Sequence, residues 1–112
     1  MNDQDQNVVK PAEVKQLIEL LQYQDASIVS RVLLKNKGGT VTLFAFDLGE
    51  GLSEHTAPFD ALVVVTDGAA DIEIAGESFR VKQGETIILP ANRPHAVKAA
   101  IRFKMLLIMI RA

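Results

Sequence analysis

Hydrophobic and polar residues alternate along most of the chain from residue 27 onward, and this pattern predicts a series of short β-strands. The predicted strands cover residues 27–35, 40–48, 61–66, 86–89, 95–99 and 101–110. Glycine and proline separate these runs, as is typical of antiparallel barrels and sandwiches. We therefore predict an all-β fold, built as one small closed barrel or sandwich.

A hairpin between residues 71 and 82 has the clearest local pattern. We place its two-residue turn at Gly76-Glu77, because glycine supplies the positive φ that a hairpin turn needs. The pairs that follow are Ile74–Phe79 and Ile72–Val81 on one face, with Glu73–Arg80 and Asp71–Lys82 on the other. Apolar pairs on one face and opposite charges on the other are the arrangement that cross-strand packing favours.

The N-terminal part of the chain follows a different pattern. Residues 1–10 are polar and predict a loose tail. After Pro11, the apolar residues recur at helical spacing, at Val14, Leu17, Ile18 and Leu21. We predict a short amphipathic helix over residues 11–22, packed on the barrel as part of one domain that covers residues 11–112.

Two of the predicted strands are apolar on both faces, over residues 62–65 and 106–110. The second face of such a strand in an antiparallel sheet must be covered by another element. The N-terminal helix could cover part of it, and a second copy of the chain is the better complement for the rest. The sequence therefore predicts a homodimer.

Composition narrows the class of protein. A chain of 112 residues has room for one core, and 48% hydrophobic with 23% charged residues is the balance of a globular domain. The net charge is −2 with acids and bases intermixed, so we expect no nucleic-acid partner. Cysteine is absent, which excludes disulfides and thiolate metal sites. No apolar run is long enough to span a bilayer, and we expect a soluble cytoplasmic protein without a membrane partner.

The only two histidines of the chain, His55 and His95, lie in recognisable motifs. Gly84, five further residues, Pro90, a short turn and then His95 closely resemble the second conserved motif of the cupin superfamily. Residues 49–68 are similar to its first motif, in which a glycine precedes His-x-His, a glutamate and a closing glycine. The resemblance covers roughly residues 27–110. It implies a double-stranded antiparallel β-helix, the jelly-roll barrel of the cupins, which is often dimeric.

The resemblance also implies a metal site. In metal-binding cupins, the two histidines and the glutamate of the first motif hold one divalent metal together with the histidine of the second. Carried over to this chain, His55 matches the first ligand and His95 the last. The remaining two positions fall on Ala57 and Ala61, whose side chains are methyl groups. A catalytic metal usually has three protein ligands, so two histidines would hold it weakly.

Three neighbouring carboxylates are candidates for extra ligands. Asp60 is adjacent to Ala61, but successive side chains of a strand point to opposite faces, so Asp60 should point outward if Ala61 points inward. Glu54 and Glu50 could reach the site from the loop. The sequence does not show which of these arrangements occurs.

Two functions fit these observations. The sequence favours a small-molecule-binding cupin with a degenerate metal site, in which His55, His95, Ala57 and Ala61 line the ligand pocket inside the barrel. The alternative is a metal-dependent oxygenase, isomerase or lyase acting on a small polar substrate, with one weakly held Zn, Ni, Mn or Fe ion. A weaker third hypothesis is a sensory or assembly module that acts through its dimer. The ligand, and whether the protein is an enzyme, stay open at this point.

Overall fold

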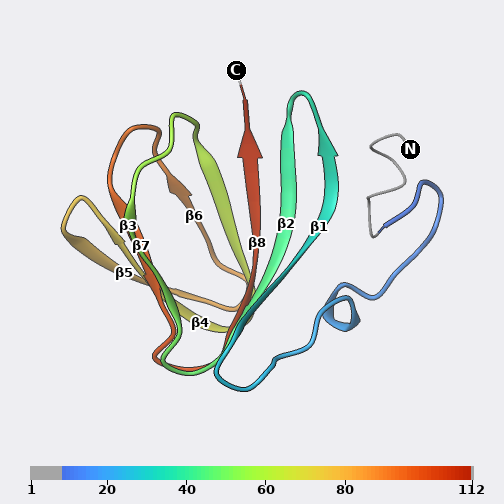
Figure 1. Ribbon diagram of the computed structural model, residues 1–112, viewed down its shortest axis with the longest axis horizontal. Helices are drawn as coiled ribbons and strands as arrows, with labels where there is room; N and C mark the ends of the chain where they lie inside the picture. Colours follow the sequence, from blue (N-terminus) through green and yellow to red (C-terminus); the bar gives the residue numbers. More distant parts are fainter. Residues whose placement is uncertain (1–8, 112) are drawn as a thin grey trace.

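In the computed structural model, which describes residues 9–111, eight antiparallel strands form two sheets that face each other (Figure 1). The strands are β1 (Ile28–Asn36), β2 (Gly39–Phe46), β3 (Gly51–His55), β4 (Ala61–Ile74), β5 (Glu77–Lys82), β6 (Thr86–Leu89), β7 (His95–Lys98) and β8 (Phe103–Ile110). Sheet A has the order β1-β2-β8-β4-β6, and sheet B has the order β3-β7-β4-β5. The predicted all-β jelly-roll fold is confirmed.

Strand β4 belongs to both sheets. Its first half pairs with β6 and β8 in sheet A, and its second half pairs with β5 and β7 in sheet B. A register shift lies between Val65 and Asp67, and the strand bends at Gly68 with φ +69°. A Cβ at Gly68 would lie 2.1 Å from the carbonyl oxygen of Arg102, so only glycine fits. The shift keeps the apolar side chains of both halves inside, at Ala61, Val63, Val65, Ala70, Ile72 and Ile74.

The space between the sheets is filled by aromatic and aliphatic side chains. The rings of Phe46 and Phe103 are fully buried and stack with their centroids 4.5 Å apart. Phe44 packs against Phe46 from the same strand. Phe103, Met105 and Val97 belong to one buried cluster that joins the two sheets. The stacked rings lie at the end of β2 and the start of β8, so the sandwich is tightly packed at this end.

The outer face of sheet A carries a second apolar cluster, which the N-terminal segment covers in part. Its buried members are Leu21, Leu33, Leu43 and Ala45, with Val9, Leu20, Tyr23, Val29, Val41 and Leu106 packed around them. This cluster explains why the strands of sheet A are apolar on both faces. Residues 9–27 run across that face and along the outside of β1 (Figure 1).

The predicted helix over residues 11–22 is wrong. The structure has a single 3-10 turn there, η2 (Leu17–Glu19), and Val14 is 99% exposed. Backbone carbonyls of this segment accept hydrogen bonds from side chains of the sheet: Arg31 donates to Leu20 and Lys104 donates to Ile18. These tertiary contacts, together with the burial of Leu21, outweigh the helical pattern of the sequence. Residues 1–8 of the predicted polar tail lie outside the described residues.

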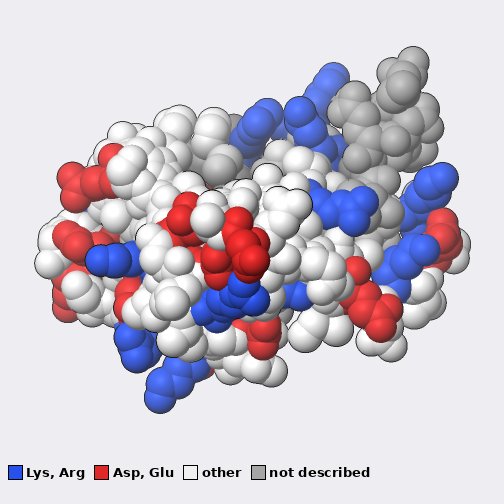
Figure 2. Space-filling model, turned by 60° about the horizontal axis from the view of Figure 1, so that its bottom comes forward, with Lys and Arg blue, Asp and Glu red and all other residues white. Residues whose placement is uncertain are grey.

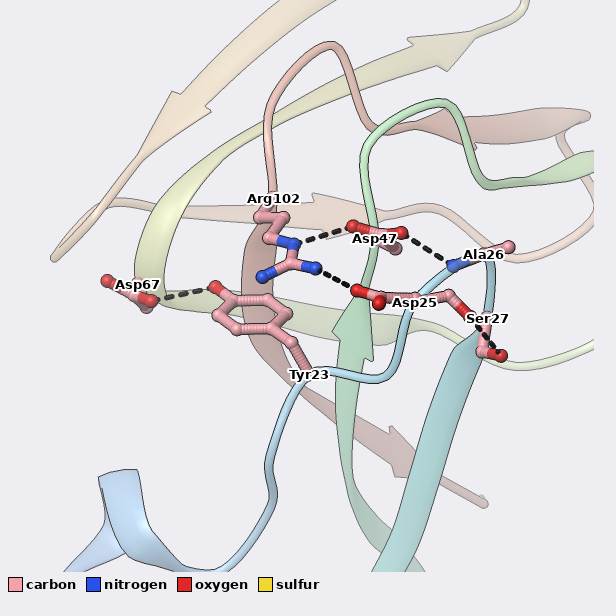
Figure 3. Close-up of polar contacts among 7 residues, drawn as sticks. All are labelled: Tyr23, Asp25, Ala26, Ser27, Asp47, Asp67 and Arg102. Carbon is pink, nitrogen blue, oxygen red and sulfur yellow. Dashed lines mark hydrogen bonds and ion pairs between the residues drawn. The ribbon is translucent and has the colours of Figure 1, made fainter.

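A cluster of polar side chains fastens the end of this segment to sheet A (Figure 3). The hydroxyl of Tyr23 donates a 2.7 Å hydrogen bond to Asp67. The cationic groups of Arg102 and Lys104 lie 5.3 and 5.1 Å from the centroid of the Tyr23 ring. Burial, more than the hydrogen bond to Asp67, raises the pKa of the Tyr23 hydroxyl above its usual range. Tyr23 therefore stays neutral and acts as an anchor.

The hairpin of β4 and β5 is present, but its predicted register is wrong by two residues. The turn is Ala75-Gly76 instead of Gly76-Glu77, and both turn residues have positive φ, 49° and 84°. Two positive φ values are the signature of a type I′ turn, whose twist matches that of the strands. Because the shift is even, each side chain keeps its face. Asp71 now lies opposite Arg80, and the two form an ion pair at 2.9 Å.

Charged side chains of both signs lie next to each other on the face shown in Figure 2. At one end of the sandwich, Arg102 forms ion pairs with both Asp47 and Asp25. Within residues 9–111, no helix has the length and apolar character needed to cross a membrane.

Candidate functional site

The two histidines lie at one end of the sandwich, where two loops meet. The loop between β3 and β4 and the loop between β6 and β7 are both at the top of Figure 1. The backbone N–H of Asn92 donates to the carbonyl of Ala57 at 2.8 Å, and that of Ala91 donates to the Asp60 carboxylate at 2.8 Å. These bonds hold the two loops together, and we call this part of the molecule the open end.

His55 and His95 are direct neighbours across strands β3 and β7. The register of the two strands places them opposite each other, although they are 40 residues apart in the sequence. Their Nε2 atoms are 3.1 Å apart, and the ring centroids are 4.4 Å apart in an edge-to-face arrangement. His95 is 6% exposed, while His55 lies at the surface. One imidazole is therefore buried and the other faces the solvent.

Backbone carbonyls set the protonation of both rings. Nδ1 of His55 lies 2.8 Å from the carbonyl oxygen of Ser53, and Nδ1 of His95 lies 3.2 Å from that of Arg93. A carbonyl oxygen only accepts, so each Nδ1 carries the proton and donates it. In neutral imidazoles both Nε2 atoms are then bare, and their lone pairs face each other. With these tautomers, a proton or a metal ion between the two nitrogens would stabilise the pair; with the other tautomer of one ring, its Nε2–H would donate to the Nε2 of the other.

The environment of His95 favours its neutral form. Burial lowers the pKa of the His95 imidazole, and the nearby His55 lowers it further. The hydrogen bond to the carbonyl of Arg93 acts in the opposite direction. A neutral imidazole is the form that binds a metal, so this shift prepares His95 to act as a ligand.

The distance between the two Nε2 atoms fits a shared metal ion. With metal–nitrogen bonds of about 2.05 Å, a separation of 3.1 Å corresponds to an angle of about 100° at the metal. This lies between the right angle of an octahedral site and the wider angle of a tetrahedral one. Within residues 9–111, no group of three or more His, Cys, Asp or Glu side chains is arranged to hold a metal ion. His55 and His95 are therefore two donors, fewer than the three protein ligands of a usual catalytic metal site.

The carboxylates that the sequence offers as extra metal ligands make other contacts or lie elsewhere in the structure. Asp60 accepts the N–H of Ala91 and so holds the loop. Ala61 is 6% exposed and its side chain faces the interior with Val63 and Val65, so the predicted alternation between Asp60 and Ala61 fits the structure. Glu54 is exposed and joins no cluster of metal-binding groups. The idea that Glu50 reaches the site is wrong, because its backbone pairs with Ala99 at the opposite end.

A groove of about 770 Å³ lies elsewhere, on the outer face of sheet B. Ile72 and Val97 point into the core, so their neighbours along the strands, Asp71, Glu73 and Lys98, point outward into the groove. Neither histidine lines it. The groove has no signature in the sequence, because it depends on how four strands pair and curve. Its charges are of both signs, and Asp71 is paired with Arg80.

Strand β3 is the part of the site that sequence reasoning missed. The motif placed His55 after a turn, and the structure places it at the end of a strand that pairs with β7. The carbonyls of Ser53 and Arg93, which orient the rings, were missed as well. The one sequence feature that the two carbonyls share is that each belongs to the residue two positions before its histidine.

Comparison with known proteins gives consistent results. Residues 42–110 match the family model described as "Cupin domain". A conserved protein of unknown function from Streptococcus pyogenes, SPY1581, is 34% identical with a TM-score of 0.89, over 95% of this chain and 93% of that one. A cupin 2 conserved barrel domain protein from Leptotrichia buccalis is 46% identical with a TM-score of 0.82, over 85% of this chain. This chain spans 46% of the Leptotrichia protein.

A cupin superfamily protein from Desulfitobacterium hafniense is 26% identical, with a TM-score of 0.84 over 90% of this chain and 93% of that one. No curated protein matches the chain. The matches therefore establish kinship and fold, and they carry no reaction with them.

Proposed function

The chain belongs to the cupin family, and on that basis we propose that it binds a small molecule at its open end, at one divalent metal ion held by His55 and His95. The observation that carries this proposal is the convergence of the two Nε2 atoms at 3.1 Å, with both Nδ1 atoms donating to backbone carbonyls. In this proposal the first motif lacks two of its metal ligands, and the two remaining histidines form a reduced metal site.

The packing of the core supports a ligand site near the histidines. Phe46 and Phe103 stack at the end of β2 and the start of β8, and they close the end of the barrel interior that lies away from the histidines. The pocket predicted inside the barrel, lined by His55, His95, Ala57 and Ala61, would then open at the end that carries the two histidines. His55 faces the solvent there, and a ligand reaches the metal from that side.

Each residue of the site has a definite role in this proposal. His55 and His95 hold the metal through Nε2, and the carbonyls of Ser53 and Arg93 fix the tautomers and the ring orientations. The hydrogen bond between Asn92 and Ala57 keeps the two loops in register. A bound Zn, Ni, Mn or Fe ion would act as a Lewis acid toward an oxygen of the ligand. An isomerase, lyase or oxygenase activity is compatible with this site, and ligand binding alone is as well.

The experiment that tests the proposal is the metal content of the purified protein by elemental mass spectrometry, before and after loading with Ni, Zn, Mn or Fe. We expect about one metal ion per chain, lost in both His55→Ala and His95→Ala. Glu54→Ala is the matched control, because it removes an exposed acid beside His55 and should keep the metal. Metal-free protein under saturating metal would overturn the proposal and leave a proton shared between the two rings.

The homodimer predicted from the sequence stays a prediction, and the outer face of sheet A supports it. Ile88, Leu62 and Ile108 lie side by side across β6, β4 and β8 on that face. The N-terminal segment leaves its margins open, since Ile88 is 58% exposed, Leu34 51% and Ile110 63%. A second copy of this chain presents the same apolar face and would cover these side chains.

A further inference from the structure

We propose that the groove on the outer face of sheet B binds a short extended peptide that carries an acidic and a basic side chain two residues apart. This groove, which we call the sheet B groove, has a volume of about 770 Å³ and is lined by β3, β7, β4 and β5 (Figure 1). Neither histidine lines it, so a ligand here would bind without the proposed metal ion. Three features indicate a peptide: the length of the groove, two charges without partners, and the side chains of the lining.

The sheet B groove extends across the sheet from one edge strand to the other. Ser53 of β3 and Ser78 of β5 both line it, with β7 and β4 between them. Neighbouring strands lie about 4.8 Å apart, so the three steps from β3 to β5 give a length of about 14 Å. An extended peptide rises about 3.3 Å per residue, so about four residues would span the groove.

Short side chains on both sides of β4 leave room for the backbone of such a peptide. Ala96 of β7 and Ser78 of β5 lie opposite the same residue of β4. Two residues along the strands, Lys98, Asp71 and Arg80 form a row across β7, β4 and β5. The groove therefore has a wall of long charged side chains beside a floor that is open on either side of β4.

Two charged side chains of the groove have no partner within residues 9–111. Asp71 and Arg80 form an ion pair with each other. Lys98 and Glu73 form no ion pair or side-chain hydrogen bond in that range. Asp71 lies opposite Lys98, and Glu73 is two residues further along the same strand, opposite Ala96. Lys98 and Glu73 are therefore diagonal neighbours, and the Cα atoms of such a pair are about 7–8 Å apart.

The spacing of these two charges matches that of alternate side chains in an extended peptide. Successive side chains point to opposite faces, and every second one lies on the same face, about 6.7 Å further along. A Glu-x-Lys sequence can therefore place its carboxylate on Lys98 and its ammonium on Glu73 at the same time. Reversal of the chain direction exchanges the two, so Lys-x-Glu fits as well. A free amino acid does not fit, because its ammonium and carboxylate groups are bonded to the same carbon.

The rest of the lining disfavours other classes of ligand. The groove carries two acidic and two basic side chains, so a polyanion gains no net attraction from it. Four charged groups also disfavour an apolar ligand, which would desolvate them. Phe79 is the one aromatic residue among the described residues of the lining, and its ring packs against the core cluster. It therefore offers no platform on which a sugar or a nucleobase could stack.

The test is an NMR titration of the full-length, isotope-labelled protein with two capped peptides of the same composition. Acetyl-Ala-Glu-Ala-Lys-Ala-amide presents both charges on one face, and acetyl-Ala-Glu-Lys-Ala-Ala-amide presents them on opposite faces. We expect the first peptide to shift the amide signals of Glu73, Ala96 and Lys98. It should bind about fivefold more tightly than the second, which loses one of the two exposed ion pairs. The difference should shrink at high salt, because exposed charges are screened.

A charge reversal in the groove should change the preferred peptide. Lys98→Glu leaves two acidic groups without partners, so we expect it to prefer acetyl-Ala-Lys-Ala-Lys-Ala-amide over the Glu-x-Lys peptide. Lys82→Glu is the matched control, because Lys82 is exposed on the same strand as Arg80 but does not line the groove. It makes the same change in net charge and should keep the preference of the wild type.

Several results would overturn the proposal. Equal binding of the two isomeric peptides would show that the spacing of Lys98 and Glu73 is not recognised. Equal shifts with free glutamate and lysine would exclude a peptide as the preferred ligand, and shifts confined to His55 and His95 would place the binding elsewhere. Ala96→Leu fills the floor and should abolish binding, with its melting temperature as the check on folding. Unchanged binding in that folded variant would exclude the groove, and Lys98→Glu decides the matter if Ala96→Leu does not fold.

Discussion

Arg102 and Asp47 are 55 residues apart in the sequence, and Nε of Arg102 donates a 2.6 Å hydrogen bond to Oδ1 of Asp47. The same guanidinium bonds Asp25, and the second oxygen of Asp47 accepts the N–H of Ala26 (Figure 3). This group joins the end of β2, the start of β8 and the segment before β1. The hydrogen bond from Arg102, followed by those from backbone N–H groups, lowers the pKa of Asp47 to about 2.

This shift predicts how stability depends on pH. The pKa of Asp47 in the folded state is below its unfolded value of 3.8, so its contribution is present above that value and lost as the pH falls toward 2. We expect Asp47→Asn to be less stable than the wild type at pH 6, with the difference in melting temperature narrowing between pH 4 and pH 2. Thermal unfolding followed across this range would measure it. A difference independent of pH would contradict the assignment.

The stacked pair of Phe46 and Phe103 predicts a large loss of stability on truncation. Phe103 is fully buried against Phe46, and Phe103→Ala removes a ring that no other group can replace. We expect the free energy of unfolding in urea to fall by about 3–5 kcal/mol. Val14→Ala is the control, because a side chain that is 99% exposed should change it by less than about 0.5 kcal/mol.

The turn between β4 and β5 predicts a stabilising change. Ala75 has φ 49°, a conformation that asparagine adopts more easily than alanine, and it precedes Gly76. Ala75→Asn should raise the free energy of unfolding by about 0.5–1 kcal/mol. Ala100→Asn, at an exposed position outside the left-handed region, should give no gain. A loss of stability in Ala75→Asn would argue against the turn geometry.

The open margin of sheet A predicts a change of oligomeric state. Ile88→Glu places a charge in the apolar row formed with Leu62 and Ile108. We expect the wild type to be a dimer and Ile88→Glu to be a folded monomer by light scattering coupled to size-exclusion chromatography. Leu48→Glu, which is equally exposed but lies on the loop after β2, should stay dimeric. A monomeric wild type would refute the homodimer.

Most of the sheet could be predicted from the sequence because alternation of side chains directly reflects which face is buried. Strand β6 was predicted with its observed bounds, and β7 and β1 within one residue at each end. The two histidines were found from motif spacing. The register of β3 against β7 brings the two rings together. This register could not be predicted from the local sequence, because β3 is a short and irregular edge strand.

The errors have physical causes that a single sequence does not reveal. The N-terminal segment has a helical pattern, but Lys104 and Arg31 bind its carbonyls and hold it in an extended form. The hairpin register depended on whether alanine or glutamate would take the positive φ beside Gly76, and both choices keep the same faces. Strand β4 was predicted as a strand that ends at residue 66, because the glycine of its bend, Gly68, is also typical of a turn between two strands.

The bend of β4 has a consequence for how the molecule unfolds. Its 14 residues pair with β5, β6, β7 and β8, so neither sheet is complete without this one strand. Unfolding of sheet A at β4 also disrupts the backbone hydrogen bonds of sheet B. We therefore expect the two sheets to unfold together. We expect hydrogen exchange of the β4 amides to occur only through global unfolding, which makes this strand the slowest-exchanging part of the chain.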